Sequence, residues 1–233
     1  MDRITRKSLK DDKFAAEVGH SVEYISGHRQ QVLRYGGIAA VVLALAIGIF
    51  FYRQHRKTLV HQSLYKALET YHALVTDEER PGRVTFKTEA DKNNKALREF
   101  EALTKDFSGT TEGQIARYYL GLVHRDMGKM AEAQKHLEQA TREGPDYTRA
   151  LARLSLADVY IAQGMDEEAR KVYEYLIKNP TDAVSEGRAQ LAMARYLSSR
   201  KPEDARKLLQ DLIKRPGTIS AAAGMILRDL DPR

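Results

Sequence analysis

The side chains best able to do chemistry in this sequence are histidines and a few pairs of neighbouring carboxylates. The seven histidines are His20, His28, His55, His61, His72, His124 and His136. None lies in an HExxH helix, and the sequence has no glycine-rich phosphate loop and no GxSxG serine elbow. The pairs Glu167-Glu168 and Glu203-Asp204 stand where helices are expected to begin, and carboxylates there favour the positive helix end. The sequence therefore predicts a protein that is not an enzyme and has no catalytic residue, metal site or cofactor.

The amino-acid composition limits the classes of partner that the protein is expected to bind. The protein has 233 residues, with 38 Lys or Arg against 32 Asp or Glu, for a net charge of +6. A nucleic-acid binder normally concentrates positive charge on one face, whereas nearly every basic stretch here alternates with acidic residues. We therefore expect solvated helix faces, with neither a nucleic-acid partner nor a small-molecule substrate. The chain contains no cysteine, which excludes disulfides, cysteine-bound zinc and thiol catalysis.

One segment carries no charge at all. From Tyr35 to Tyr52 the sequence reads YGGIAAVVLALAIGIFFY, bounded by Arg34 and Arg53. As a helix it would span about 27 Å, close to the hydrocarbon thickness of a bilayer. A buried core helix would show a polar face, and a cleaved signal peptide would end in small residues rather than RQHRK. Residues 35–52 are therefore predicted to be a transmembrane signal anchor.

The charges beside the anchor leave its orientation open. More basic residues follow the segment than precede it, which opposes an N-inside arrangement. Long domains cross membranes largely regardless of charge, however, and the opposite arrangement would export a tail with seven basic residues. We favour a cytoplasmic N-terminus.

Small residues recur every fourth position along the anchor, at Gly36, Ala40, Ala44 and Gly48. Such a face lets two transmembrane helices approach closely. The alternative is that Gly and Ala are simply common in these segments.

Beyond the anchor the sequence repeats. Ala133, Ala169 and Ala205 are 36 residues apart. The same spacing relates Leu120, Leu156 and Ala192; His124, Tyr160 and Tyr196; Leu137, Tyr173 and Leu209; and Ala140, Leu176 and Leu212. Each copy has the pattern of two amphipathic helices, with small residues where the helices cross. One hairpin cannot bury its apolar face alone, so we expect the copies to stack into an all-α solenoid.

Glycine and proline mark the breaks in these copies. Gly128 and Gly164 suit the end of a first helix, since glycine enters the left-handed region freely, and Arg200 takes this place in the third copy. Pro145, Pro180 and Pro216 would end the second helices. These windows resemble tetratricopeptide repeats, with two additional residues in each link and a degenerate third copy in which Met193 replaces a small residue.

The resemblance implies a concave groove lined by the first helices. Carrying the family's groove positions over gives Tyr118, Leu122 and Arg125 in the first copy, Leu154, Asp158 and Ile161 in the second, and Gln190 in the third. Such a mixture of groups suits an extended peptide or an inserted helix. The alternative is that the chain's own helix at 218–230, or the linker, fills the groove.

The predicted organisation has five parts. A polar tail, residues 1–34, precedes the anchor at 35–52; residues 53–111 hold a juxtamembrane helix, a loop and a degenerate first repeat. Within that part we expect helix over Lys57–Val75, a long loop over Thr76–Asn93, and a second helix around Ala96 and Phe100. Three repeats occupy 112–216, and a capping helix occupies 217–233.

This layout resembles the bacterial YfgM-like family, the ancillary subunits of the SecYEG translocon. The resemblance implies an inner-membrane protein with a periplasmic repeat domain, which contacts translocon subunits or periplasmic chaperones as an adaptor for export. The rival hypothesis is a scaffold for envelope assembly or cell division that self-associates through its anchor.

Overall fold

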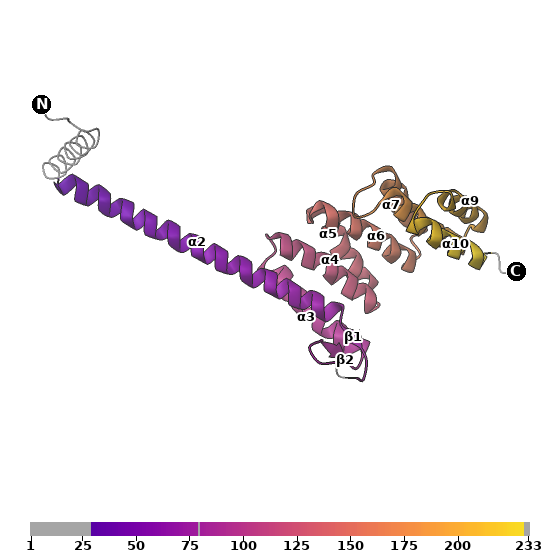
Figure 1. Cartoon of the computed structure of the whole chain (residues 1–233), viewed down its shortest axis with the longest axis horizontal. Helices are drawn as coiled ribbons and strands as arrows, with labels where there is room; N and C mark the ends of the chain where they lie inside the picture. Colours follow the sequence, from indigo (N-terminus) through magenta and orange to yellow (C-terminus); the bar gives the residue numbers. More distant parts are fainter. Residues whose placement is uncertain (1–28, 79, 231–233) are drawn as a thin grey trace, which may run out of the picture. The chain divides into compact units, whose positions relative to one another are not determined.

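A computed structural model describes residues 29–78 and 80–230 of the chain (Figure 1). The polar tail expected over residues 1–34 therefore lies almost entirely outside the described residues. The chain divides into two compact units, residues 1–58 and 59–233, which we treat separately.

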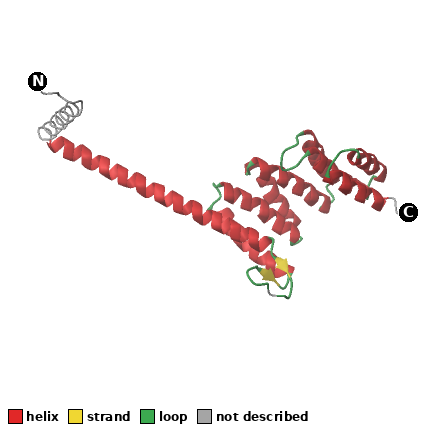
Figure 2. Cartoon of the chain, in the orientation of Figure 1, coloured by secondary structure: helices red, strands yellow, loops and turns green. Residues whose placement is uncertain are grey.

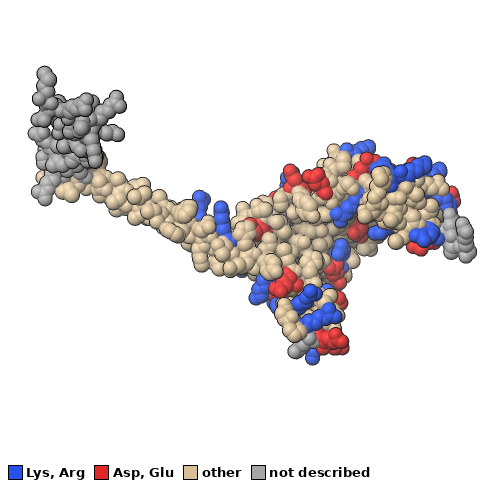
Figure 3. Space-filling view, viewed as in Figure 1, with Lys and Arg blue, Asp and Glu red and all other residues tan. Residues whose placement is uncertain are grey.

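The longest element is helix α2, from Arg29 to Tyr71. It contains the whole predicted anchor, and large apolar side chains such as Leu45 (61% exposed) and Phe51 (65% exposed) are uncovered along it. No Lys, Arg, Asp or Glu interrupts this part of the helix in Figure 3. Within the described part of the chain, α2 is the single helix long and apolar enough to be a candidate membrane span.

The second unit is mostly helical, and the long connection between α2 and α3 contains its two short strands (Figure 2). Its elements after α2 are β1 (Leu74–Val75), β2 (Thr85–Phe86), α3 (Glu89–Asp106), α4 (Thr111–Asp126), α5 (Met130–Glu143), α6 (Asp146–Ala162), α7 (Asp166–Lys178), α8 (Glu186–Ser198), α9 (Pro202–Ile213) and α10 (Thr218–Leu230).

The region before α3 differs from the sequence prediction. The helix expected over Lys57–Val75 ends at Tyr71, and Leu74–Val75 instead pairs in parallel with Thr85–Phe86. The loop expected over Thr76–Asn93 is shorter, because α3 begins at Glu89. Its start is fixed by Thr88, whose hydroxyl accepts a hydrogen bond from the Asp91 backbone N–H at 3.0 Å, an N-cap arrangement.

Three helical hairpins follow: α4 with α5, α6 with α7, and α8 with α9. Ala133, Ala169 and Ala205 are each the fourth residue of the second helix, and all three are fully buried. The three alanines therefore occupy equivalent places where the two helices of a hairpin cross.

The hairpin turns are closed in two ways. Gly128 and Gly164 both have φ of 75°, as predicted for helix-ending glycines. Around Gly128, the Lys129 N–H donates to the His124 carbonyl at 2.8 Å, the long bond of a Schellman motif. The third turn has no left-handed residue; there the Lys201 N–H donates to the Leu197 carbonyl at 2.7 Å, and Pro202 starts α9.

Helices at both ends of the stack complete its core. Val60, Leu64 and Ala67 of α2 are buried with Phe100 of α3 and Leu120 of α4, so the end of α2 acts as the first helix of an additional hairpin. At the other end α10 packs on Leu191 of α8 and Leu209 of α9, through Ala223 among others. The expected last helix over Thr218–Leu230 is thus confirmed.

Candidate interaction cleft

Two of the predicted groove residues lie in the hydrophobic core. Tyr118 is 9% exposed and Leu122 is 6% exposed. Both belong to the cluster that joins α4, α5 and α6, together with Leu137 and Leu156. The seam between α4 and α6 is therefore filled with apolar side chains and offers little to a ligand.

The three residues predicted from the second repeat come together in a cleft of about 340 Å³ between α6 and α8. We call it the α6–α8 cleft. It is lined by Leu154, Asp158, Ile161, Tyr173, Ala192, Arg195, Tyr196, Ser199 and Arg200. Helix α10 contributes none of these residues, because it packs instead against α8 and α9.

The cleft is open because three apolar residues that fill the α4–α6 seam have polar or smaller residues at the equivalent positions of the next repeat. Leu122 corresponds to Asp158, 36 residues further along the chain. By the same spacing, the buried Leu156 corresponds to Ala192, which removes the side chain that would fill the space. The fully buried Val159 corresponds to the exposed Arg195. Two large apolar groups are thus exchanged for a carboxylate and a guanidinium, and a third for a methyl group.

Asp158 gives the cleft its acidic group. The Tyr173 hydroxyl, at the end of a buried ring, donates to the Asp158 carboxylate over 3.5 Å. Desolvation by the cleft walls raises the pKa of Asp158 above its ordinary value, although the residue as a whole is exposed, and the nearby Arg125 and Arg195 partly oppose this rise. In the described part of the chain Arg195 makes no hydrogen bond or ion pair, so its guanidinium is available to a ligand.

The outer rim of the cleft is held in place by an aromatic and ionic contact. The Arg200 guanidinium lies 4.7 Å from the centre of the Tyr196 ring and forms a 3.0 Å ion pair with Asp166. Stacking and pairing restrict an otherwise flexible side chain. This rim is therefore ordered before any partner binds.

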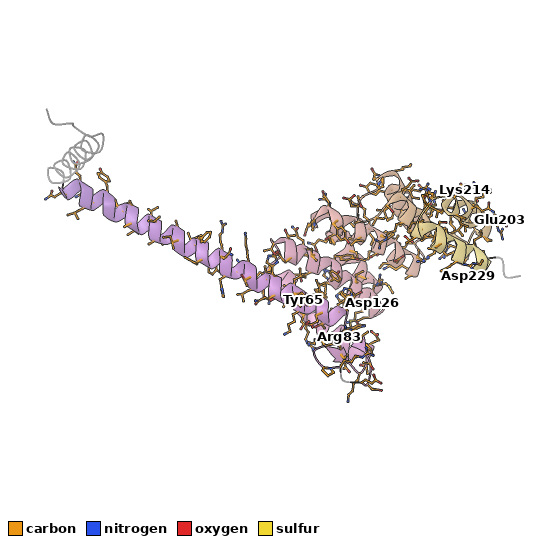
Figure 4. All side chains as sticks on the ribbon, in the orientation of Figure 1. Tyr65, Arg83, Asp126, Glu203, Lys214 and Asp229 are labelled. Carbon is orange, nitrogen blue, oxygen red and sulfur yellow. The ribbon has the colours of Figure 1, made fainter. Side chains whose placement is uncertain are left out.

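The remaining predicted groove residues do not line the cleft. Arg125 hydrogen-bonds Asp126 at 2.8 Å, and the same carboxylate accepts a 2.9 Å bond from the Tyr71 hydroxyl at the end of α2. Figure 4 places Asp126 at the end of α4. Gln190 donates to Glu186 on its own helix at 2.9 Å.

The wall supplied by α8 was missed by sequence reasoning. The family's groove positions lie on the same face of the first helix in every repeat. A cleft between the first helices of two repeats, however, is bounded by different faces of those two helices. The α8 wall could have been predicted by comparing the apolar positions of successive copies. Ala192 and Arg195 occupy the positions at which the preceding copy has Leu156 and Val159.

A second group of side chains able to do chemistry is a stacked pair of histidines between α4 and α5, inside the first hairpin. The rings of His124 and His136 are 5.3 Å apart and nearly parallel, at 1°. Both Nδ1 atoms are buried without a hydrogen-bond partner. Burial, with the neighbouring imidazole as a second cause, lowers the pKa of His136 to about 4. Zinc sites need at least three protein ligands, and no group of three or more candidate ligands occurs among the described residues.

Comparison with known proteins identifies one family. The model of the tetratricopeptide repeat-like domain matches residues 33–211, from two residues before the uncharged stretch of α2 to the second half of α9. No curated protein matches the chain, and no solved structure matches it.

Proposed function

Because the chain belongs to the tetratricopeptide repeat-like family, a group of protein-interaction domains, we propose that it binds a partner protein in the α6–α8 cleft. The observation that carries this proposal is the replacement of a filled apolar seam by an open one with Asp158, Ala192 and Arg195 in its walls. A position that only stabilised the stack would be served better by leucine and valine, as between α4 and α6.

The cleft favours a short extended segment with one apolar side chain. Leu154, Ile161 and Ala192 offer the apolar surface for that side chain. Asp158 accepts hydrogen bonds from the segment's N–H groups or a cationic side chain, and Arg195 donates to its carbonyl or carboxylate groups. Fixed polar groups around an apolar centre give orientation and specificity to such a site.

Site-specific photo-crosslinking in cells tests this placement. A photo-crosslinking amino acid at Ser199, on the exposed rim, should give a discrete crosslinked partner band. The same amino acid at Lys214, an exposed residue just after the end of α9 and outside the cleft (Figure 4), serves as the matched control. Equal band patterns from the two positions would show that the cleft is not where a partner binds.

We further propose that α2 anchors this domain in the inner membrane and that the protein is an adaptor for export at the translocon. The supporting features are the exposed apolar stretch of α2 and the likeness of the layout to the YfgM-like family. Anchoring raises the effective concentration of the domain near membrane partners, so that a weak cleft contact suffices. Residues 35–52 are proposed as the span and 112–216 as the three repeats.

Affinity purification from gently solubilised membranes tests the adaptor role. The proposal expects translocon subunits or periplasmic chaperones to copurify with the intact chain. Recovery of envelope-assembly or division proteins in their place would support the rival scaffold, and recovery of neither would contradict the adaptor role without affecting the cleft experiment.

A further inference from the structure

A second cleft lies at the other end of α6. It has a volume of about 720 Å³ and is formed by the end of α5, the first half of α6 and the end of α7. We call it the arginine cleft, and its main walls are Arg142, Arg149, Arg153, Asp146, Tyr175 and Leu176. It shares no residue with the α6–α8 cleft. Arg149 and Asp158 are nine residues apart on α6, or about 14 Å along the helix axis.

Positive charge in this cleft exceeds negative charge. Asp146 forms an ion pair with Arg149 on its own helix. Arg153 instead contacts the Thr141 carbonyl at 3.4 Å and lies 5.0 Å from the centre of the Tyr175 ring. Among the described residues, neither Arg142 nor Arg153 pairs with a carboxylate. Two guanidinium groups are therefore available to an anionic ligand.

The geometry of Arg153 suits carboxylate recognition. Its planar group is held by the carbonyl and the tyrosine ring, so little conformational entropy is lost when a ligand binds. Guanidinium groups bind carboxylates through two parallel hydrogen bonds, which are stronger than bonds between neutral groups.

The cleft also has an apolar floor, which distinguishes it from a site for a simple inorganic anion. Leu176 and Ala150 are 1% and 2% exposed beneath it. Tyr175 beside them is 47% exposed, and its ring can cover an apolar side chain of a ligand. The far wall is braced by Thr181, whose hydroxyl accepts a hydrogen bond from the Val184 N–H at 3.1 Å. A ligand that uses the whole cleft carries both carboxylates and an apolar group.

The spacing of the arginines fits an extended chain. Arg149 and Arg153 are four residues apart on α6, or about 6 Å along its axis. The ion pair of Arg149 with Asp146 is solvent-exposed and so contributes little stability, which leaves Arg149 able to exchange Asp146 for a carboxylate of the ligand. Alternate side chains of an extended segment are separated by about 6.6 Å and point to the same side. We propose that the arginine cleft binds an extended acidic segment of a partner protein, with carboxylates at two alternate positions and an apolar residue at the next. The domain then contacts partners at two separate sites, and this second contact does not depend on the first.

Fluorescence anisotropy with the full chain in detergent micelles tests this proposal. The probe is a labelled seven-residue glycine peptide with glutamate at positions 2 and 4 and phenylalanine at position 6. Arg142→Gln and Arg153→Gln should each weaken binding about fivefold, the effect of roughly 1 kcal/mol. Replacing both glutamates of the peptide with glutamine, or its phenylalanine with serine, should also weaken binding.

Two controls separate this site from the rest of the protein. Ala192→Leu, which alters only the α6–α8 cleft, should leave the peptide affinity unchanged. Arg142 is exposed and without a partner among the described residues, so Arg142→Gln should keep the helical circular dichroism of the parent. Equal affinity in the arginine variants, or displacement of the probe by inorganic phosphate at the same concentration as unlabelled peptide, would overturn the proposal.

Discussion

At the scale of single residues, the proposed binding site lies where the repeats differ. Positions that keep the same character, such as Ala133, Ala169 and Ala205, are buried at helix crossings and maintain the stack. Ala192 and Arg195 depart from the leucine and valine of the preceding copy and open the α6–α8 cleft. Divergence between copies is therefore the residue-level indicator of the candidate site.

The histidine pair predicts loss of stability in mild acid. Because burial lowers the folded-state pKa of His136 to about 4, the unfolded chain, with an ordinary pKa near 6.5, binds the proton more readily. Stability is therefore complete above about pH 6.5 and falls as the pH decreases toward 4, by at most about 3 kcal/mol for this residue. Thermal unfolding followed by circular dichroism from pH 7 to pH 4.5 measures the loss.

His136→Phe is the matched control for this effect. Phenylalanine keeps a ring against His124 but cannot accept a proton, and it removes a buried Nδ1 that has no partner. The variant should lose less stability than the parent over the same pH range. Identical pH dependence in the two proteins would show that His136 does not titrate in this way.

Sequence reasoning found one wall of the cleft and not the other. Leu154, Asp158 and Ile161 could be predicted because repeat families place groove residues at fixed positions of the first helix. The burial of Tyr118 and Leu122 could not, since it depends on Leu156 and its neighbours filling the seam from the next helix. A groove residue is exposed or buried according to the side chains that the neighbouring helix places against it.

At the scale of elements, the helices and their turns follow closely from the sequence. The 36-residue period predicts three hairpins, and in the structure their second helices begin 36 residues apart, at Met130, Asp166 and Pro202. The pairing of Leu74–Val75 with Thr85–Phe86 has no comparable signal. Two-residue strands are too short for an alternating pattern, and their pairing depends on the fold around them.

Substitution of the turn glycines tests the element assignments. Gly128 has φ of 75° with open space around it, so Gly128→Ala should cost about 1 kcal/mol through backbone strain alone. Gly224→Ala is the same chemical change inside α10, also in open space, and should stabilise the protein by up to about 1 kcal/mol. Denaturant unfolding measures both, and the same sign for the two would contradict these assignments.

The small-residue face of α2 makes a separate prediction. Gly36 and Gly48 have open space beside them, and Ala40 and Ala44 lie on the same proposed packing face. Replacing Ala40 and Ala44 with leucine should abolish association between anchors, measured as energy transfer between labelled chains in vesicles, if that face packs. Peptide binding by the repeats should be unaffected; unchanged energy transfer would exclude the packing role.

At the scale of the whole molecule, one family match runs from residue 33 to residue 211 and so includes both the apolar part of α2 and the repeats. The proposed topology places the N-terminus in the cytoplasm and the repeats in the periplasm. Protease added to spheroplasts should therefore digest the repeat domain, while carbonate washing should leave the chain in the membrane. A protected repeat domain, or release by carbonate, would contradict this topology.

Ala192→Leu is the most direct test of partner binding in the α6–α8 cleft. The substitution restores the residue found at the equivalent position, Leu156, and should change the free energy of unfolding by less than about 1 kcal/mol. It should also abolish the partner crosslink from a photo-crosslinking amino acid at Ser199. A stable Ala192→Leu protein that keeps the parent's crosslink would show that the cleft is not the binding site.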